Sequence, residues 1–324
     1  MPVTAAASLA AIRYALPAAV RSVRELAAAG AVSSAPELLE RFGFGRVRVA
    51  EEETPYDLAR EAAGALLREE GIDPASIDAV VYGGAPGAVA FARPGDAAEH
   101  APGVCDMRRF HSPATRLQYE LGLERATVLA LDQLACTTLF GAVRVARALC
   151  AAEGLERVLC VASEFFPAAA GREAIANCTS DAACALLVRR GGARNRIVGA
   201  ATVTKGYYWE GDALRDEVIA SYFPTALHVL RRTIADAGWS AADVDWVVPH
   251  NVSTTSWEVL LGLVGLPRAR LWAANIARVG HTLAGDNFIN LRDALADGTI
   301  AAGDRVLLFS YGYGAHWTAL AVEA

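Results

Sequence analysis

The sequence lacks the cysteine spacings that build zinc sites and disulfide frameworks. Its six cysteines form no C-x-x-C pair and no cysteine–histidine ligand pattern. Several stand between apolar neighbours, which is typical of small core residues. The six are Cys105, Cys136, Cys150, Cys160, Cys178 and Cys184. We therefore expect no metal site, no structural disulfide, and no cofactor beyond what a substrate carries.

Charged residues are also scarce. They make up 20% of the 324 residues, against 54% hydrophobic residues, which indicates an extensively buried interior and an oligomer interface. The net charge is −6 and the arginines are scattered, so neither nucleic acid nor an anionic membrane is an expected partner. No apolar run approaches the roughly 20 residues that span a bilayer. Residues 1–19 lack the pattern of a secretory signal, and we expect a cytoplasmic enzyme.

Two sequence patterns each occur twice, in the same order. Residues 71–82 and 238–249 both contain a glycine that ends a helix, a short turn, an aspartate and a Val-Val strand. Residues 156–162 and 304–310 both read as buried strands that follow an amphipathic helix. Between these repeats, residues 127–131 and 270–275 supply a further extended segment in each half. The shared order predicts that the chain contains two copies of one arrangement of helices and strands.

The duplication predicts an α/β protein. Continuous apolar strands separated by helices are typical of sheets that are covered on both faces. We place the join between the halves near residues 189–194. The predicted division is an N-terminal half, residues 1–190, and a C-terminal half, residues 191–324.

Cys136 differs from the other cysteines in its local context. Residues 131–144 read as the end of a strand, a short turn and a long helix that starts at about Cys136. Free backbone N–H groups and the positive end of the helix dipole favour a thiolate there, which makes the sulfur a better nucleophile. The alternative is one more small apolar residue at a helix start.

Two histidines follow predicted strands in the second half. His250 comes after residues 245–249, and His281 lies just ahead of a helix, at the place that corresponds to Cys136 in the first half. Both could approach the sulfur from the opposite half, although a histidine at such a junction is often a capping or core residue. His316 is a competing candidate. The glycine turn at residues 310–315 suits an oxyanion hole, or is an ordinary tight turn.

These segments together resemble the thiolase superfamily, and most closely the β-ketoacyl-acyl carrier protein synthase III group. The likeness covers most of the chain in the right order. Residues 41–44 resemble that group's early Arg-Thr-Gly-Ile, residues 132–141 its nucleophile segment, residues 179–187 its Gly-Asp-Gly-Ala-Gly strand, residues 248–251 its Pro-His-Gln, residues 280–282 its Gly-Asn-Thr, and residues 312–317 its glycine-rich turn.

The resemblance implies a five-layered α-β-α-β-α thiolase fold, a homodimer, and acyl-CoA or acyl-carrier-protein thioesters as substrates. It implies that Cys136 accepts the acyl group and that His250 and His281 are catalytic. The oxyanion hole would use backbone N–H groups of Cys136 and of the turn Gly312, Tyr313 and Gly314. Substrate contacts would come from Asn251, Ser253 and Phe110, the last within residues 91–112, which we expect to form a dimer-facing wall.

Four departures from the group indicate a specialised relative. His281 stands where synthase III enzymes usually have asparagine, and resembles the Cys-His-His sites of elongating ketoacyl synthases. Ser253 replaces an asparagine, Tyr313 interrupts the triple glycine, and the tryptophan usual near residues 36–38 is missing. The pathway we expect is polyketide or other secondary metabolism rather than primary fatty acid biosynthesis.

Two enzyme functions follow from an acyl-Cys136 intermediate. The first, which the sequence favours slightly, is decarboxylative Claisen condensation, with both histidines donating toward a thioester carbonyl as an enolate forms. The second is acyl transfer to a hydroxyl or amine, with His250 as general base. A non-catalytic partner subunit of a polyketide synthase would be expected to lack the nucleophile. A cysteine hydrolase is the remaining enzyme function.

Overall fold

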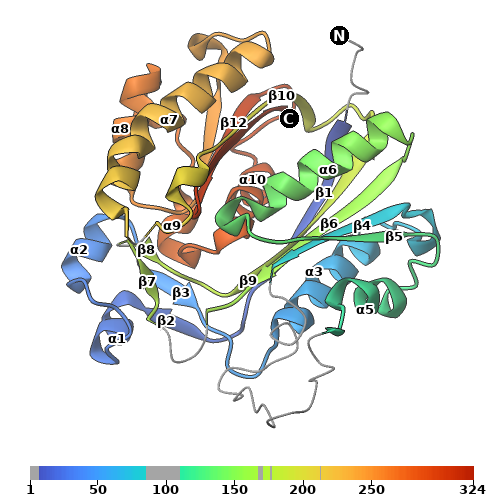
Figure 1. The fold of residues 1–324 in the computed structure, drawn as a ribbon, viewed down its shortest axis with the longest axis horizontal. Coiled ribbons are helices and arrows are strands. Elements are labelled where there is room, and N and C mark those ends of the chain that lie inside the picture. Colours follow the sequence, from blue (N-terminus) through green and yellow to red (C-terminus); the bar gives the residue numbers. More distant parts are fainter. Residues whose placement is uncertain (1–6, 85–109, 167–170, 176, 212) are drawn as a thin grey trace.

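A single nine-stranded sheet runs through the protein (Figure 1). Five adjacent strands on one side of it belong to the N-terminal half. The computed structural model describes residues 7–84, 110–166, 171–175, 177–211 and 213–324. From the centre outward the N-terminal strands are β1 (Ala7–Ala15), β9 (Ala182–Arg190), β6 (Arg157–Glu164), β4 (Ala79–Gly84) and β5 (Thr127–Leu131). β1, β9 and β6 pair antiparallel, whereas β6, β4 and β5 pair parallel.

The C-terminal half repeats this order. Its strands are β10 (Arg196–Thr204), β13 (His316–Glu323), β12 (Arg305–Gly312) and β11 (Trp246–Pro249). The first three again pair antiparallel and the last pair is parallel. In place of a fifth strand, Leu271 forms an isolated parallel bridge to Val247. β1 and β10 pair over Ala7 and Ser8, which joins the two halves edge to edge.

Helices lie on both faces of each half sheet and between the halves (Figure 1). α3 (Pro55–Glu69) and α5 (Pro113–Glu120) cover the outer face of the first half, and α7 (Arg215–Asp236) and α8 (Thr254–Val264) that of the second. α6 (Thr138–Ala152) and α10 (Asp286–Ala296) form the middle layer. The remaining short elements are α1 (Val23–Ala28), α2 (Pro36–Arg41), α9 (Ala274–Val279), β2 (Val20–Ser22), β3 (Arg46–Arg48), β7 (Glu173–Ala174), β8 (Asn177–Cys178), and the 3₁₀ turns η1 (Pro74–Ser76), η3 (Ala135–Thr137), η4 (Gly206–Tyr208), η5 (Ala241–Asp243), η6 (Arg268–Arg270) and η7 (Leu283–Gly285).

Alternation along the strands produces the layers. On β9, Cys184 and Leu186 pack into the middle core, whereas their neighbours Ala185 and Leu187 pack into the outer core beneath α3. Successive side chains of a strand point to opposite faces, so a strand that is apolar throughout needs cover on both sides. This arrangement confirms the predicted α/β class, with helices and half sheets in the order α-β-α-β-α.

α6 is the apolar helix at the centre of the molecule. Residues 135–152, which combine η3 and α6, are long and apolar enough to cross a membrane by length and composition alone, contrary to our reading of the sequence. The helix lies between the two half sheets (Figure 1), where both of its sides need apolar residues. The buried residues of this segment, 44% of it, pack in the middle core, which accounts for the apolar residues on that side of the helix.

The sequence repeats correspond to equivalent strands. The first repeated pattern ends in β4 and β11, and the second is β6 and β12. The extended segment expected at residues 127–131 is β5, but the one expected at 270–275 is wrong. There η6 and α9 leave a single bridging residue, Leu271, because helical turns occupy both sides of it. Our division at residues 190 and 191 lies in the connection from β9 to β10 and stays a proposal.

Candidate active site

Cys136 lies in a strained turn after β5. It is the middle residue of η3, so α6 begins two residues later than the sequence predicts. Gln133 and Ala135 have positive φ values of 65° and 45°, a conformation that non-glycine residues hold only where surrounding contacts fix it. The Ser310 hydroxyl, on β12, donates to the Cys136 carbonyl at 3.1 Å. This hydrogen bond connects the turn that carries the nucleophile to the C-terminal half.

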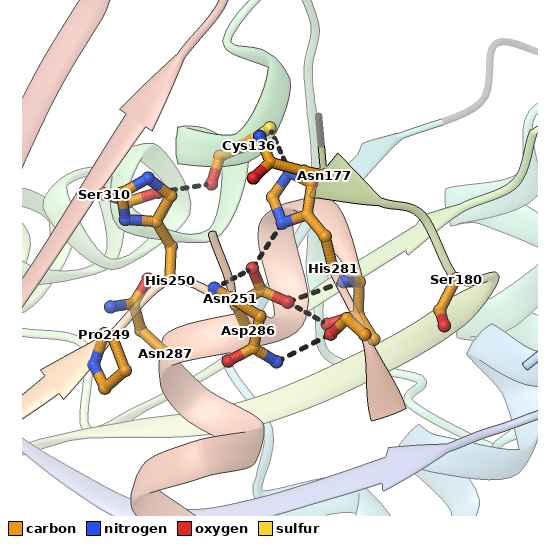
Figure 2. Close-up of polar contacts among 12 residues, drawn as sticks. Cys136, Asn177, Ser180, Pro249, His250, Asn251, His281, Asp286, Asn287 and Ser310 are labelled. Atoms are coloured by element: carbon orange, nitrogen blue, oxygen red, sulfur yellow. Dashed lines mark hydrogen bonds and ion pairs between the residues drawn. The ribbon is translucent and has the colours of Figure 1, made fainter. Parts of the chain in front are cut away.

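His281 contacts the sulfur directly. Its Nε2 lies 3.3 Å from Cys136 Sγ (Figure 2). The His281 backbone is held from the N-terminal half, because its N–H donates to the Cys178 carbonyl at 2.8 Å and it forms a bridge with Thr179. The expectation that an imidazole from the second half would reach this sulfur is met by His281.

Asp286 completes a relay that our sequence reasoning missed. Its Oδ2 lies 2.5 Å from His281 Nδ1 and also accepts from Asn251 N at 2.6 Å. Its Oδ1 accepts from Thr282 N at 2.6 Å and from the Thr282 hydroxyl at 2.7 Å. The carboxylate is completely buried. The only sequence signal was an aspartate five residues after a candidate histidine at a helix start, where a carboxylate ordinarily reads as a cap.

The relay perturbs the charge state of His281. Burial alone would lower the pKa of this imidazole, but the Asp286 carboxylate and the Cys136 sulfur raise it well above the ordinary value. An imidazolium is therefore stabilised between two acidic groups. Cys136, His281 and Asp286 have the sulfur–imidazole–carboxylate order of a nucleophile, a base and an orienting acid.

His250 lies beside this relay without joining it. Its ring centroid is 6.3 Å from that of His281, and the Trp257 indole donates to its backbone carbonyl at 3.0 Å. His250 Nδ1 lies 3.2 Å from the Phe309 carbonyl, which can only accept a hydrogen bond. Nδ1 therefore carries the proton of the neutral ring and Nε2 has none. Burial and the neighbouring His281 lower the pKa of His250 to about 3, so the ring stays neutral.

Asn251 has a different role from the predicted one. Its amide nitrogen donates to the Gly280 carbonyl at 2.7 Å and its amide oxygen accepts from Asn290 at 2.8 Å. The residue is completely buried. The prediction that Asn251 binds substrate is therefore wrong, because its polar atoms hold the loop that carries His281 and Asp286.

Gly312 brings the glycine turn against the nucleophile turn. A Cβ atom at Gly312 would lie 2.4 Å from the Leu134 carbonyl and 3.0 Å from the Thr137 hydroxyl, so only glycine allows this approach. Tyr313 and Gly314 line the same cavity as Cys136. The oxyanion hole from Cys136 and this turn stays a prediction that the position supports.

A cavity of about 1000 Å³ reaches the sulfur. Its wall includes the polar side chains Asp132, Gln133, Thr138, Glu164 and His316, together with Leu134, Phe165, Phe166, Trp209, Leu283 and Tyr313. His316 Nδ1 lies 2.9 Å from the Thr204 hydroxyl, so this competing histidine faces the cavity but not the relay. The space is large enough for a substantial ligand.

The other predicted substrate contacts are not assembled. Ser253 donates from its backbone N–H to Asn177 at 3.3 Å, and its buried hydroxyl meets no partner within the described residues. Phe110 is 69% exposed and is not among the cavity-lining residues. Residues 91–109, most of the predicted dimer-facing wall, lie outside the described residues. Both substrate roles stay predictions.

The remaining described cysteines are core residues. Cys150, Cys160, Cys178 and Cys184 are buried and free, and burial raises the pKa of each thiol. Across the described ranges, no group of three or more potential ligands could hold a metal ion. Cys105 lies outside the described residues.

Comparison with known proteins gives the family. The family described as the C-terminal region of 3-oxoacyl-[acyl-carrier-protein (ACP)] synthase III matches residues 234–324. A relative from Streptomyces coelicolor, β-ketoacyl-[acyl-carrier-protein] synthase III 2, is 30% identical over 231 residues, which cover 66% of this chain and 69% of the relative. The chain therefore belongs to the β-ketoacyl-acyl carrier protein synthase III family, whose members are acyl-transferring condensing enzymes.

Two solved structures have the same fold. The 3-oxoacyl-[acyl-carrier-protein] synthase III of Aquifex aeolicus aligns with a TM-score of 0.81 at 21% identity and covers 98% of this chain and 100% of that one. ChlB3, described as an acyltransferase, aligns with a TM-score of 0.82 at 19% identity and covers 98% of both chains.

Proposed function

We propose that this protein transfers an acyl group from a CoA or carrier-protein thioester to a hydroxyl or amine acceptor through an acyl-Cys136 intermediate. The single observation that carries the proposal is the Cys136–His281–Asp286 relay, with 3.3 Å between sulfur and imidazole and 2.5 Å between imidazole and carboxylate. Such a relay moves one proton on and off a nucleophile, which is the requirement of acyl transfer.

In the first half-reaction the Cys136 thiolate attacks the thioester carbonyl. The carbon–sulfur bond to the carrier breaks, and the proton on His281 Nε2 leaves with the carrier thiol. His281 is then neutral, with its remaining proton on Nδ1 facing Asp286. Its Nε2 holds a lone pair beside the acyl group.

In the second half-reaction that lone pair acts as the general base. His281 Nε2 takes the proton of the acceptor hydroxyl or amine as its heteroatom attacks the acyl carbonyl. Asp286 stabilises the imidazolium that forms, and Cys136 leaves as a thiolate. The proton that left with the carrier thiol is thereby replaced on His281 Nε2, and the sulfur is free for the next cycle. No bound cofactor is needed, because sulfur, imidazole and carboxylate supply all the chemistry.

The hydrogen bonds of the two histidines weigh against condensation, which the sequence had slightly favoured. Condensation requires donors toward the carbonyl oxygen of an extender thioester as its enolate forms. His250 donates its Nδ1 proton to the Phe309 carbonyl, and neutral His281 in the acyl-enzyme donates its Nδ1 proton to Asp286. The neutral His250 ring would present a lone pair where a donor is required, and His281 would donate from Nε2 only as the imidazolium that Asp286 stabilises. Membership in a condensing family keeps condensation as the second candidate.

Acyl carrier protein stands in the names of the relatives, and we propose it, or CoA, as the donor's carrier. We also propose a homodimer joined along β5. This strand is the edge of the nine-stranded sheet, its backbone is unpaired on one side among the described strands, and Leu129 is 39% exposed on it. The departures noted in the sequence support a role in secondary metabolism.

The two candidates differ in their products. The protein is first incubated with an acyl-CoA, and intact mass and peptide mapping identify the acylated residue. A malonyl thioester or a panel of hydroxyl and amine acceptors is then added. Transfer to an acceptor without CO₂ release is the expected result. CO₂ release with a β-ketoacyl product, and no ester or amide, would establish condensation instead.

A further inference from the structure

The cavity that reaches Cys136 contains a carboxyl group that the proposed chemistry does not use. Glu164 is the last residue of β6, at the carboxyl end of the strand, and it lines this cavity. Its Oε2 accepts a hydrogen bond from Ala284 N at 3.2 Å in the turn η7, and the Thr138 side chain is a second hydrogen-bond partner. The charges of His281 and Asp286 also act on this carboxyl group, in opposite directions.

Burying a carboxyl group in a cavity wall costs free energy unless other polar groups form hydrogen bonds with it. Burial raises the pKa of Glu164 to about 7, so near neutral pH the group can both donate and accept a hydrogen bond. The Ala284 N–H uses one of its several lone-pair positions. An acyl chain of hydrocarbon alone would leave the remaining capacity unsatisfied on the wall it contacts.

We propose that Glu164 is a specificity-determining residue that hydrogen-bonds a hydroxyl group on the transferred acyl chain, so that hydroxyacyl thioesters are the preferred donors. This inference depends on the proposed acyl-Cys136 intermediate, because Cys136 and Glu164 line one cavity and an acyl group on the sulfur shares that space. A hydroxyl both donates and accepts, and therefore suits a carboxyl group in either protonation state. A free carboxylate on the chain, as in a malonyl group, suits it poorly.

A competition between two donors tests the proposal. The protein is mixed with equal amounts of butyryl-CoA and 3-hydroxybutyryl-CoA without any acceptor, and intact-protein mass spectrometry measures the ratio of the two acyl-enzymes early in the reaction. The two adducts differ by one oxygen atom. The wild-type protein is expected to favour the hydroxyacyl adduct about tenfold, because the analogue without the hydroxyl leaves the carboxyl unpaired.

Two variants of matched length identify the residue responsible. Glu164→Met removes the polar atoms and should bring the ratio close to one, whereas Glu164→Gln keeps a donor and an acceptor and should retain most of the preference. Asp293→Asn alters a carboxylate that does not line this cavity and should keep the wild-type ratio. If Glu164→Met fails to fold, as judged by circular dichroism, Glu164→Ala replaces it.

Equal acylation of the wild-type protein by both donors would overturn the proposal, and so would a tenfold preference that survives Glu164→Met. Failure of the proposed function gives a different result. In that case the hydroxyacyl adduct would form with its preference intact, but no acceptor would remove it without release of CO₂ from an extender.

Discussion

Replacing Asp286 with asparagine tests the relay at its buried end. The carboxylate accepts four hydrogen bonds, two on each oxygen. An asparagine oxygen can replace Oδ1 and keep both bonds from Thr282. Its NH₂ group then replaces Oδ2 and faces His281 Nδ1 and the Asn251 N–H. The amide donates to Nδ1, so the proton of the neutral imidazole moves to Nε2 and the base loses its lone pair.

The expected loss is about 10²–10⁴-fold in acyl transfer, because inverting the tautomer of a catalytic histidine costs rates of that order in comparable relays. The amide also faces the Asn251 N–H without accepting from it, which should reduce the free energy of unfolding by about 1–3 kcal/mol. A protein with a free energy of unfolding of about 5–15 kcal/mol stays folded at 25 °C after such a destabilisation. Unfolding of part of the protein therefore cannot account for the expected loss of activity.

The assay is single-turnover transfer from preformed acyl-enzyme to an acceptor, with urea unfolding in parallel. Asp293→Asn is the control, because Asp293 lies on the same helix α10 and accepts hydrogen bonds from the half-buried Tyr14 and the buried Asn275, away from the sulfur. It also pairs with Arg278 and Arg292. The control should keep its transfer rate. Transfer by Asp286→Asn within about threefold of the wild-type rate would refute the relay.

Three further changes have defined outcomes. Gly312→Ala places a Cβ 2.4 Å from the Leu134 carbonyl oxygen. We therefore expect the rate of acyl transfer to fall at least about tenfold and the midpoint of urea unfolding to decrease. An unchanged rate would show that this turn does not position the nucleophile. Glu164 titrates at about 7 in the fold against 4.5 in the unfolded chain, so the folded state binds more protons between these values and stability falls as pH rises through that window. Glu164→Gln should reduce this pH-dependent fall in the free energy of unfolding by about 2 kcal/mol, measured by urea titrations at pH 4.5 and 7.5. The same change in unfolding free energy between the two pH values for both proteins would contradict the assignment. If the proposed dimer forms along β5, Leu129→Lys should give a monomer in light scattering, whereas a lysine in place of Leu263, which is 42% exposed on α8, should leave the wild-type mass unchanged. A dimer with both variants would place the interface elsewhere.

Much of the fold could be predicted because its signals are local. The Val-Val strands that became β4 and β11 are apolar throughout, and such strands occur where helices cover both faces. The two glycines before them, Gly71 and Gly238, both have positive φ values, as helix-ending residues do. Position in the duplicated plan made His281 one of the histidines that could approach Cys136, and its catalytic role was predicted only from the family resemblance.

The polar support of the site could not be predicted in the same way. Asp286 and Glu164 derive their roles from residues more than one turn or one strand away, and an isolated carboxyl group in a sequence ordinarily indicates a helix cap or a solvated surface. Asn251 shows the reverse error, because a polar residue after a candidate histidine suggested a substrate contact. Its two amide bonds, to Gly280 and Asn290, exist only once the loop has folded.

The duplication also explains why a charge relay can form at the centre of an apolar protein. Cys136 and Asp286 both lie at the N-terminal ends of the middle helices, the sulfur just ahead of α6 and the carboxylate as the first residue of α10. Each helix N-terminus favours negative charge through its free N–H groups and its dipole. His281 lies between them and contacts both, so its imidazole is placed between the sulfur and the carboxylate, which raise its pKa. The sulfur, two residues before the start of α6, and the carboxylate, at the start of α10, thus come from corresponding ends of the two middle helices, and His281 connects them.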